Sequence, residues 1–165
     1  MPSAALAHRR PSRKPQAATA RSRREVDAWP SVHSLMGALI GVPLKSEENV
    51  LRLQQHGMPA EAFMRLVDHL PIGVEQIVGE RSNSRRHLKA GVLSDFETER
   101  ALRVARVLTQ VIALFDDMGR AKAWVTRPAL YVSGQSEVTP LALCTHESGA
   151  KIIENRLLET QYGIF

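Results

Sequence analysis

Few side chains in this sequence have the types and spacing that covalent or metal chemistry needs. Cys144 and His146 lie two residues apart, a spacing at which an imidazole can activate a thiol as a nucleophile. The plainer interpretation is a small, half-buried thiol near a turn. Asp116 and Asp117 could bind a cation, but a charged break between two helices is the commoner explanation for such a pair.

The other residues that could do chemistry argue against an enzyme. The six histidines are scattered, none is four residues from another, and no second Cys/His pair completes a zinc site. No glycine-rich phosphate loop of the Walker or Rossmann type occurs in the sequence. We therefore expect no enzyme, no metal and no cofactor, and we look for function in binding surfaces.

The net positive charge of the chain comes from one end of it. The net charge is +5, yet residues 1–24 hold seven of the 22 Lys and Arg residues and no Asp or Glu. The remaining residues hold 15 basic and 17 acidic side chains, so their net charge is slightly negative. A segment this polar is predicted to be a disordered basic arm over residues 1–30. It either assists nucleic-acid binding, through sequence-independent attraction to phosphates, or is a dispensable leader.

The cysteine count and the lengths of the apolar stretches indicate the compartment and the membrane character of the protein. One cysteine, Cys144, cannot form an internal disulfide, which favours a reducing cytoplasm. No stretch approaches the roughly 18 apolar residues that a membrane span needs. We therefore expect a cytoplasmic protein without a membrane partner.

The elements that must position any binding residues are predicted to be helices. Ser94 and Glu97 form a capping box before a long helix with Val104 and Leu108 on one face. Pro59 and Pro71 bound an earlier helix, and Ser148 is predicted to cap the last one. Residues 129–140 are predicted to be a loop or short extended structure. The result is an all-α fold of seven to eight helices.

Residues 72–91 have the pattern of a helix-turn-helix, with a tight turn at Gly79 and a short basic second helix. A helix that reads DNA needs Arg, Lys, Asn or Gln side chains to reach base edges. Leu88 is the one sizeable apolar side chain of this basic segment, so a solvated polar helix is the competing interpretation. The candidate DNA-binding residues are Arg81, Ser82, Asn83, Ser84, Arg85, Arg86, His87 and Lys89.

The sequence ends in "LLETQYGIF", with an aromatic residue at its last position. The last helix has Ile152, Ile153 and Leu157 to bury against its own domain, so its tip is expected to project beyond that contact. An aromatic side chain at an exposed tip is typical of an anchor that fills a pocket on a partner. The competing interpretation is that Phe165 folds back onto its own domain, whereas Trp124 is expected to pack in the core.

Residues 47–165 resemble the Xre/MbcA/ParS-type antitoxins of bacterial toxin–antitoxin pairs. The first part, around "LSDFETERALRVARV", is similar to the family's Xre-like helix-turn-helix and the long helix after it. The second part carries "RAKAWVTRP", Gly134, "PLALCT", Gly149 and the ending "QYGIF" in the family's order. Family members usually carry a Thr and an apolar residue early in the recognition helix, where this sequence has Asn83 and Ser84.

The resemblance implies a non-enzymatic, all-α protein that neutralises a cognate toxin and represses its own operon. It implies three regions: a basic arm (1–30), a helix-turn-helix and dimerisation domain (31–115), and a toxin-binding domain (116–165). The partners implied are a toxin, of the RES-domain class that depletes NAD, operator DNA, and a second copy in a homodimer. The toxin contacts implied are Arg156, Glu159, Tyr162, Gly163, Ile164 and Phe165. A stand-alone helix-turn-helix regulator is the alternative function.

Overall fold

The computed structural model describes residues 31–79 and 83–163. Within these ranges the only extended pairings are two isolated bridges, so the expected all-α fold is confirmed. The arm over residues 1–30 and the site candidates Arg81, Ser82, Ile164 and Phe165 lie outside the described residues. The helices of the described part are α1 (Val32–Ile40), α2 (Glu47–His56), α3 (Ala60–Asp68), α4 (Val74–Val78), α5 (Ser84–Ala90), α6 (Asp95–Phe115), α7 (Met118–Thr126), α8 (Pro140–Cys144) and α9 (Glu147–Tyr162).

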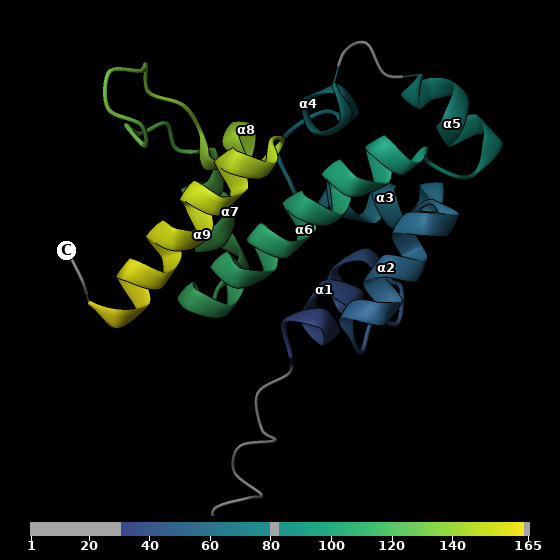
Figure 1. The fold of residues 1–165 in the computed structure, drawn as a ribbon, viewed down its shortest axis with the longest axis horizontal. Coiled ribbons are helices and arrows are strands. Elements are labelled where there is room, and N and C mark those ends of the chain that lie inside the picture. Colours follow the sequence, from purple (N-terminus) through teal and green to yellow (C-terminus); the bar gives the residue numbers. More distant parts are fainter. Residues whose placement is uncertain (1–30, 80–82, 164–165) are drawn as a thin grey trace, which may run out of the picture.

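The long helix α6 runs through the middle of the molecule and contacts helices on both sides (Figure 1). It begins at the predicted capping box, in which Glu97 N–H donates to Ser94 Oγ and the Glu97 carboxylate accepts from Ser94 N–H. Its apolar face holds the fully buried Val104, Leu108 and Val111, as the sequence pattern predicts. Because helices from both halves of the chain bury side chains against α6, one core runs through the described residues.

Helices α1 to α4 pack against one part of α6, and α7 to α9 cover the other (Figure 1). Phe63 and Leu66 of α3 are fully buried in the first group, and Ile153 of α9 is fully buried in the second. Trp124 of α7 is half-buried, with its ring centroid 6.3 Å from that of Phe115. The predicted boundary between two domains falls where α6 ends and α7 begins.

Two details of the helix pattern differ from the prediction. The described part of the chain has nine helices rather than seven to eight, and two of them, α4 and α8, are only five residues long. Ser148 does not cap α9, which begins two residues earlier with His146 at the N-cap and Ala150 N–H bonded to His146 O at 2.9 Å. The earlier start puts Glu147 in the first turn, where the helix dipole favours an acidic side chain.

The segment between α7 and α8, predicted to be a loop or short extended structure, contains one short extended pairing. Ala129 and Val138 exchange both backbone hydrogen bonds, at 3.1 and 3.0 Å, as an isolated antiparallel bridge. Across residues 31–79 and 83–163, none of the helices has the length and hydropathy to cross a membrane.

Candidate interaction surfaces

The basic helix α5 lies at one end of the molecule and has few apolar contacts with the rest of it. Leu88 is half-buried against the core, and the Ser84 side chain is buried at the start of the helix. Gly91 ends α5 at a φ of 88°, a left-handed conformation that costs glycine little. Ser84 thus faces the protein.

A polar contact holds α5 to the N-terminus of α6. His87 Nδ1 lies 2.7 Å from Glu97 Oε2, and Ser94 N–H and Oγ–H donate to the same oxygen at 3.0 and 2.9 Å. Glu97 is only 1% exposed. Burial alone would raise the pKa of Glu97, but the hydrogen bonds from Ser94 and His87 lower it below its ordinary value. His87 therefore faces inward and acts as an anchor of α5.

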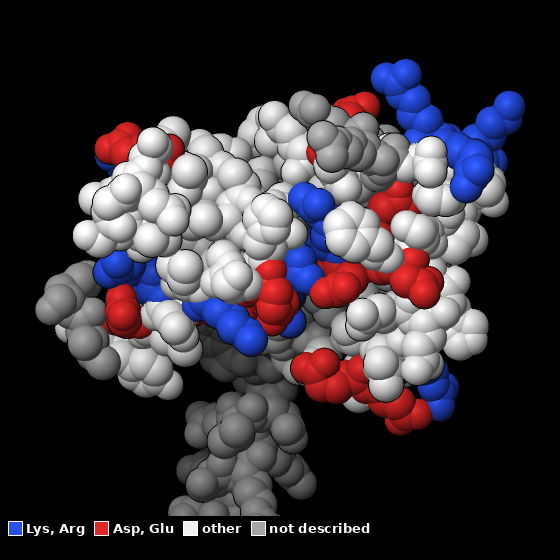
Figure 2. Space-filling model, turned by 45° about the horizontal axis from the view of Figure 1, so that its top comes forward, with Lys and Arg blue, Asp and Glu red and all other residues white. Residues whose placement is uncertain are grey.

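The other described candidates of this segment face solvent. Asn83, Arg85, Arg86 and Lys89 are exposed, and Lys and Arg side chains project from this end of the molecule in Figure 2. The Arg85 side chain is 93% exposed, and its nearest carboxylate oxygen, on Glu75, is 3.8 Å away. An ion pair this long and exposed contributes little, so the arginine is available to another anion. Exposed Arg, Lys and Asn side chains are of the types that contact the phosphates and base edges of DNA.

The last helix, α9, is held much more firmly. Its inner face buries Ala150, Ile153 and Leu157. Gly149 allows the first turn to approach α8, because a Cβ at this position would lie 2.1 Å from the carbonyl oxygen of Leu143. The glycine is therefore required by the packing of α8 against α9.

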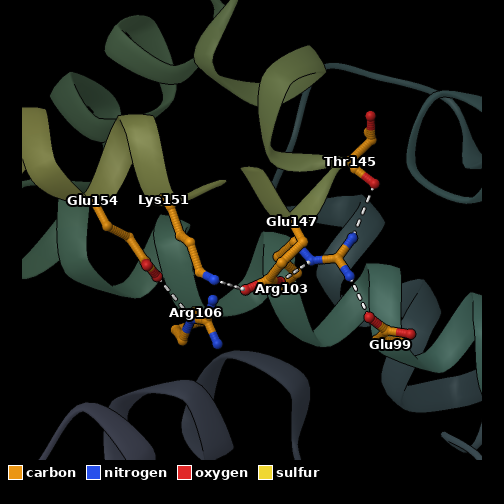
Figure 3. A network of polar contacts seen from close by, with 7 residues as sticks. All are labelled: Glu99, Arg103, Arg106, Thr145, Glu147, Lys151 and Glu154. Atoms are coloured by element: carbon orange, nitrogen blue, oxygen red, sulfur yellow. Dashed lines mark hydrogen bonds and ion pairs between the residues drawn. The ribbon is translucent and has the colours of Figure 1, made fainter. Parts of the chain in front are cut away.

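Two arginines of α6 bind the N-terminal half of α9 and the residues before it (Figure 3). Arg103 is 7% exposed, and its guanidinium donates to Glu147 Oε2 and to the Thr145 carbonyl, both at 2.9 Å, and to Glu99. Arg106 donates to Glu154 Oε1 at 2.7 Å. Because each guanidinium nitrogen of Arg103 has an acceptor, its buried charge is compensated.

Lys151 adds a weaker link to the same network, with its Nζ 3.6 Å from Glu147 Oε1. Slight burial alone would raise the pKa of Glu147, but the hydrogen bond and charge of Arg103, with Arg106 and Lys151, lower it. The carboxylate therefore stays ionised at neutral pH. The network fixes the position of α9 relative to α6.

The outer face and C-terminal end of α9 hold the described members of the predicted toxin contact. Tyr162 is 72% exposed, and Leu158, one turn earlier on the same side, is 50% exposed. Arg156 Nη1 lies 3.1 Å from Glu159 Oε2 on the exposed surface beside them. Gly163 ends the helix at a φ of 65°. Asn155, Leu158, Glu159 and Tyr162 together line a shallow depression.

Leu158 and the Arg103 network were not identified in the sequence. Leu158 is four residues before Tyr162, and this i, i+4 spacing is a sequence signal that could have placed Leu158 on the same side of the last helix. Within the network, Glu99 and Arg103 are four residues apart, but the contacts toward α9 have no sequence signal, because Arg103 and Arg106 reach acceptors 42 to 48 residues further along the chain.

The side chains considered for catalysis have structural roles. Cys144 is 1% exposed, and its burial, with Glu154 nearby, raises the pKa of the thiol to about 12, so it is not an activated nucleophile. Asp116 takes a left-handed conformation as it ends α6, and Asp117 Oδ1 accepts from Arg120 N–H at 2.6 Å as it caps α7. Among the residues with described positions, no three or more His, Cys, Asp and Glu side chains gather as a metal site.

Comparison with known proteins agrees with the family indicated by the sequence. No protein-family model matches the chain. The chain is similar to a curated protein of Pseudomonas putida named Antitoxin Xre, with 27% identity over 130 residues. The aligned residues span 76% of this chain and 80% of that protein. This similarity, over most of both chains and together with the all-α fold, supports an Xre-type antitoxin.

Proposed function

We propose that this protein is the antitoxin of a type II toxin–antitoxin pair, and that it neutralises its toxin by placing α9 and the residues after it over the toxin active site. The similarity to Antitoxin Xre supports the general role. The observation that carries the contact site is the exposed Tyr162 at the end of a helix fixed by Arg103 and Arg106. The role is inhibition by binding, without a catalytic step of its own.

The outer face of α9 has the chemistry of a binding anchor. Tyr162 presents an exposed aromatic side chain, and Arg156 and Glu159 add a charged pair at the edge. Burial of one such apolar side chain stabilises a complex by about 1.5–3 kcal/mol. Because α9 is already ordered, little conformational entropy is lost when it binds. Ile164 and Phe165, outside the described residues, are proposed to continue this contact.

The toxin class is proposed from the sequence resemblance. The "QYGIF" ending is of the kind paired with RES-domain toxins, which deplete NAD, and a helix tip inserted into a nucleotide cleft excludes substrate by occupancy. We place this interaction in the cytoplasm, with the antitoxin as a homodimer inside a larger complex.

The test is toxin binding by Tyr162→Ala. We expect the dissociation constant for the toxin encoded beside this chain to rise about 10- to 100-fold, because an aromatic anchor is lost. Leu51→Ala is the matched control, since Leu51 is 52% exposed on α2, away from α9. Unchanged affinity and unchanged protection of toxin-expressing cells for Tyr162→Ala, and for a chain lacking Ile164 and Phe165, would contradict the proposal.

A second function, repression of its own operon, is favoured by the exposed side chains of α5. Asn83, Arg85, Arg86 and Lys89 lie at the N-cap and along the length of α5 and face solvent. Arg81 and Ser82, outside the described residues, directly precede them. We propose that this segment binds operator DNA as the second helix of a helix-turn-helix, with His87 and Ser84 facing the protein.

Operator binding by Arg86→Ala tests the second function. We expect the affinity to fall about 5- to 100-fold, whether Arg86 reads a base or contacts a phosphate. The control is Arg120→Ala, which removes an exposed arginine of α7. If Arg86→Ala and Arg120→Ala bind the operator with equal affinity over a range of salt concentrations, the proposal that α5 contacts DNA is wrong.

A further inference from the structure

A cleft of about 720 Å³ lies between α1, the second half of α6 and α9. Its apolar lining consists of Val32, Ala113, Leu114, Leu157 and Leu158, contributed by all three helices. Polar side chains complete the lining, namely Gln110, Glu154, Asn155 and Gln161. The mixture is typical of a site for an apolar group that also carries a hydrogen-bond donor.

The described chain begins at this cleft. Val32, the first residue of α1, lines the cleft and also a neighbouring cavity of about 390 Å³. The residues directly before it in the sequence are "EVDAWPS", in which Trp29 precedes Val32 by three positions. Three residues span at most about 10 Å, so a link of this length can bring Trp29 into the cleft beside Val32.

A tryptophan suits the cleft in size and polarity. An aromatic side chain buries about 150–250 Å² of surface, and a buried indole N–H usually finds an acceptor. Gln110, Glu154 and Asn155, which are among the lining residues, carry side-chain oxygens that can accept a hydrogen bond. The leucines and Val32 supply the apolar surface for the ring.

The sequence also favours this chain over a separate molecule as the occupant. A segment tethered by three residues is present at an effective concentration of order millimolar, without any partner. The two cavities are lined by four carboxylates, Glu47, Glu99, Glu147 and Glu154, against two arginines, Arg103 and Arg106. The seven cations of residues 1–24 lie directly upstream, so their charge is complementary to this surface.

We propose that residues 26–30 dock in the cleft between α1, α6 and α9, with the Trp29 indole as the anchor. The contact joins the start of α1 to the C-terminal half of α9, two elements far apart in the sequence. It thereby supports the helix that presents Tyr162. The cations of residues 1–24 remain outside the cleft.

Tryptophan fluorescence of the full chain tests this docking, because Trp29 and Trp124 are its two tryptophans. In a Trp124→Phe background, emission reports Trp29 alone; Trp29→Phe gives the complementary spectrum. We expect blue-shifted Trp29 emission and an acrylamide quenching constant at least about twofold below that of the unfolded chain, because burial removes the indole from water.

Leu158→Glu should abolish that protection, because it places a charge in the cleft. Leu130→Glu is the matched control: Leu130 is 58% and Leu158 50% exposed, and Leu130 is outside the cleft lining. Circular dichroism checks that both variants fold. Full exposure of Trp29 in the parent would overturn the proposal, as would protection that survives Leu158→Glu. Protection lost on dilution would assign the cleft to a second copy and also overturn it. No toxin is present, so the result is independent of toxin binding.

Discussion

Helices α5 and α9 both attach to α6 and both present candidate recognition residues, but they are attached by different means. The anchors of α5 are the half-buried Leu88, the buried Ser84 and the His87–Glu97 contact. The anchors of α9 are a buried apolar face and the arginine network. The difference indicates that α9 presents a preformed surface, whereas α5 depends mainly on polar contacts for its position.

The largest expected effect comes from truncating the two leucine anchors. Leu157 of α9 is 6% exposed, so Leu157→Ala should lower the free energy of unfolding by about 2–4 kcal/mol. Leu88→Ala at the half-buried site of α5 should cost about 1 kcal/mol, since less surface and no full cavity are involved. Chemical denaturation measures both variants. Equal losses of unfolding free energy for the two variants would show that α5 and α9 are anchored equally by their apolar side chains.

Loss of the Arg103 side chain should come next. Arg103→Ala is expected to cost about 2–3 kcal/mol, because charged hydrogen bonds to Glu147 and the Thr145 carbonyl are lost. Arg52→Ala is the control, since Arg52 is 65% exposed and pairs with Glu48 on the same helix, a contact worth no more than about 0.5 kcal/mol. Thermal denaturation of Arg103→Ala and Arg52→Ala measures the two losses of stability. Similar losses would mean that the network is no more than a surface ion pair.

Glu97→Gln sharpens the comparison at the α5 end and should have a smaller, pH-dependent effect. The folded-state pKa of Glu97 is lowered, so its contribution is fully present above the ordinary carboxyl pKa and disappears as the pH falls through the lowered value. At pH 7 we expect a loss of about 1–2 kcal/mol, because a buried amide replaces a hydrogen-bonded carboxylate.

Urea denaturation of wild type and Glu97→Gln at pH 7 and over a series of acidic pH values checks the sign of this effect. The difference between the two proteins should narrow as the pH falls through the lowered pKa of Glu97, because the carboxylate then becomes protonated. A difference that stays constant or grows would show that the carboxylate charge does not hold α5 to α6.

The parts of this molecule that sequence could predict are those set by neighbouring residues. The capping box of Ser94 and Glu97 and the apolar face of α6 were predicted because their partners lie within a few positions. His87 was predicted as a DNA contact because its basic neighbours suggest one. Its contact with Glu97 depends on where the fold places α5 relative to the start of α6, which short-range patterns do not encode.

At α9, too, the features set by neighbouring residues could be predicted and those set by packing could not. The exposure of Tyr162 could be predicted from the apolar residues available to the last helix. The start of that helix could not, since Ser148 is a better capping residue in isolation than His146. The position of Glu147 opposite Arg103 is a long-range feature that accompanies the earlier start. The cleft between α1, α6 and α9 is likewise a product of packing.

Hydrogen exchange of the antitoxin, free and bound to its toxin, tests the central claim most directly. Residues 155–163 lie at the end of a helix and should exchange readily in the free protein. The account predicts that the toxin slows exchange over these residues and leaves residues 83–90 unchanged. Slowed exchange over residues 83–90 with none over residues 155–163 would contradict it.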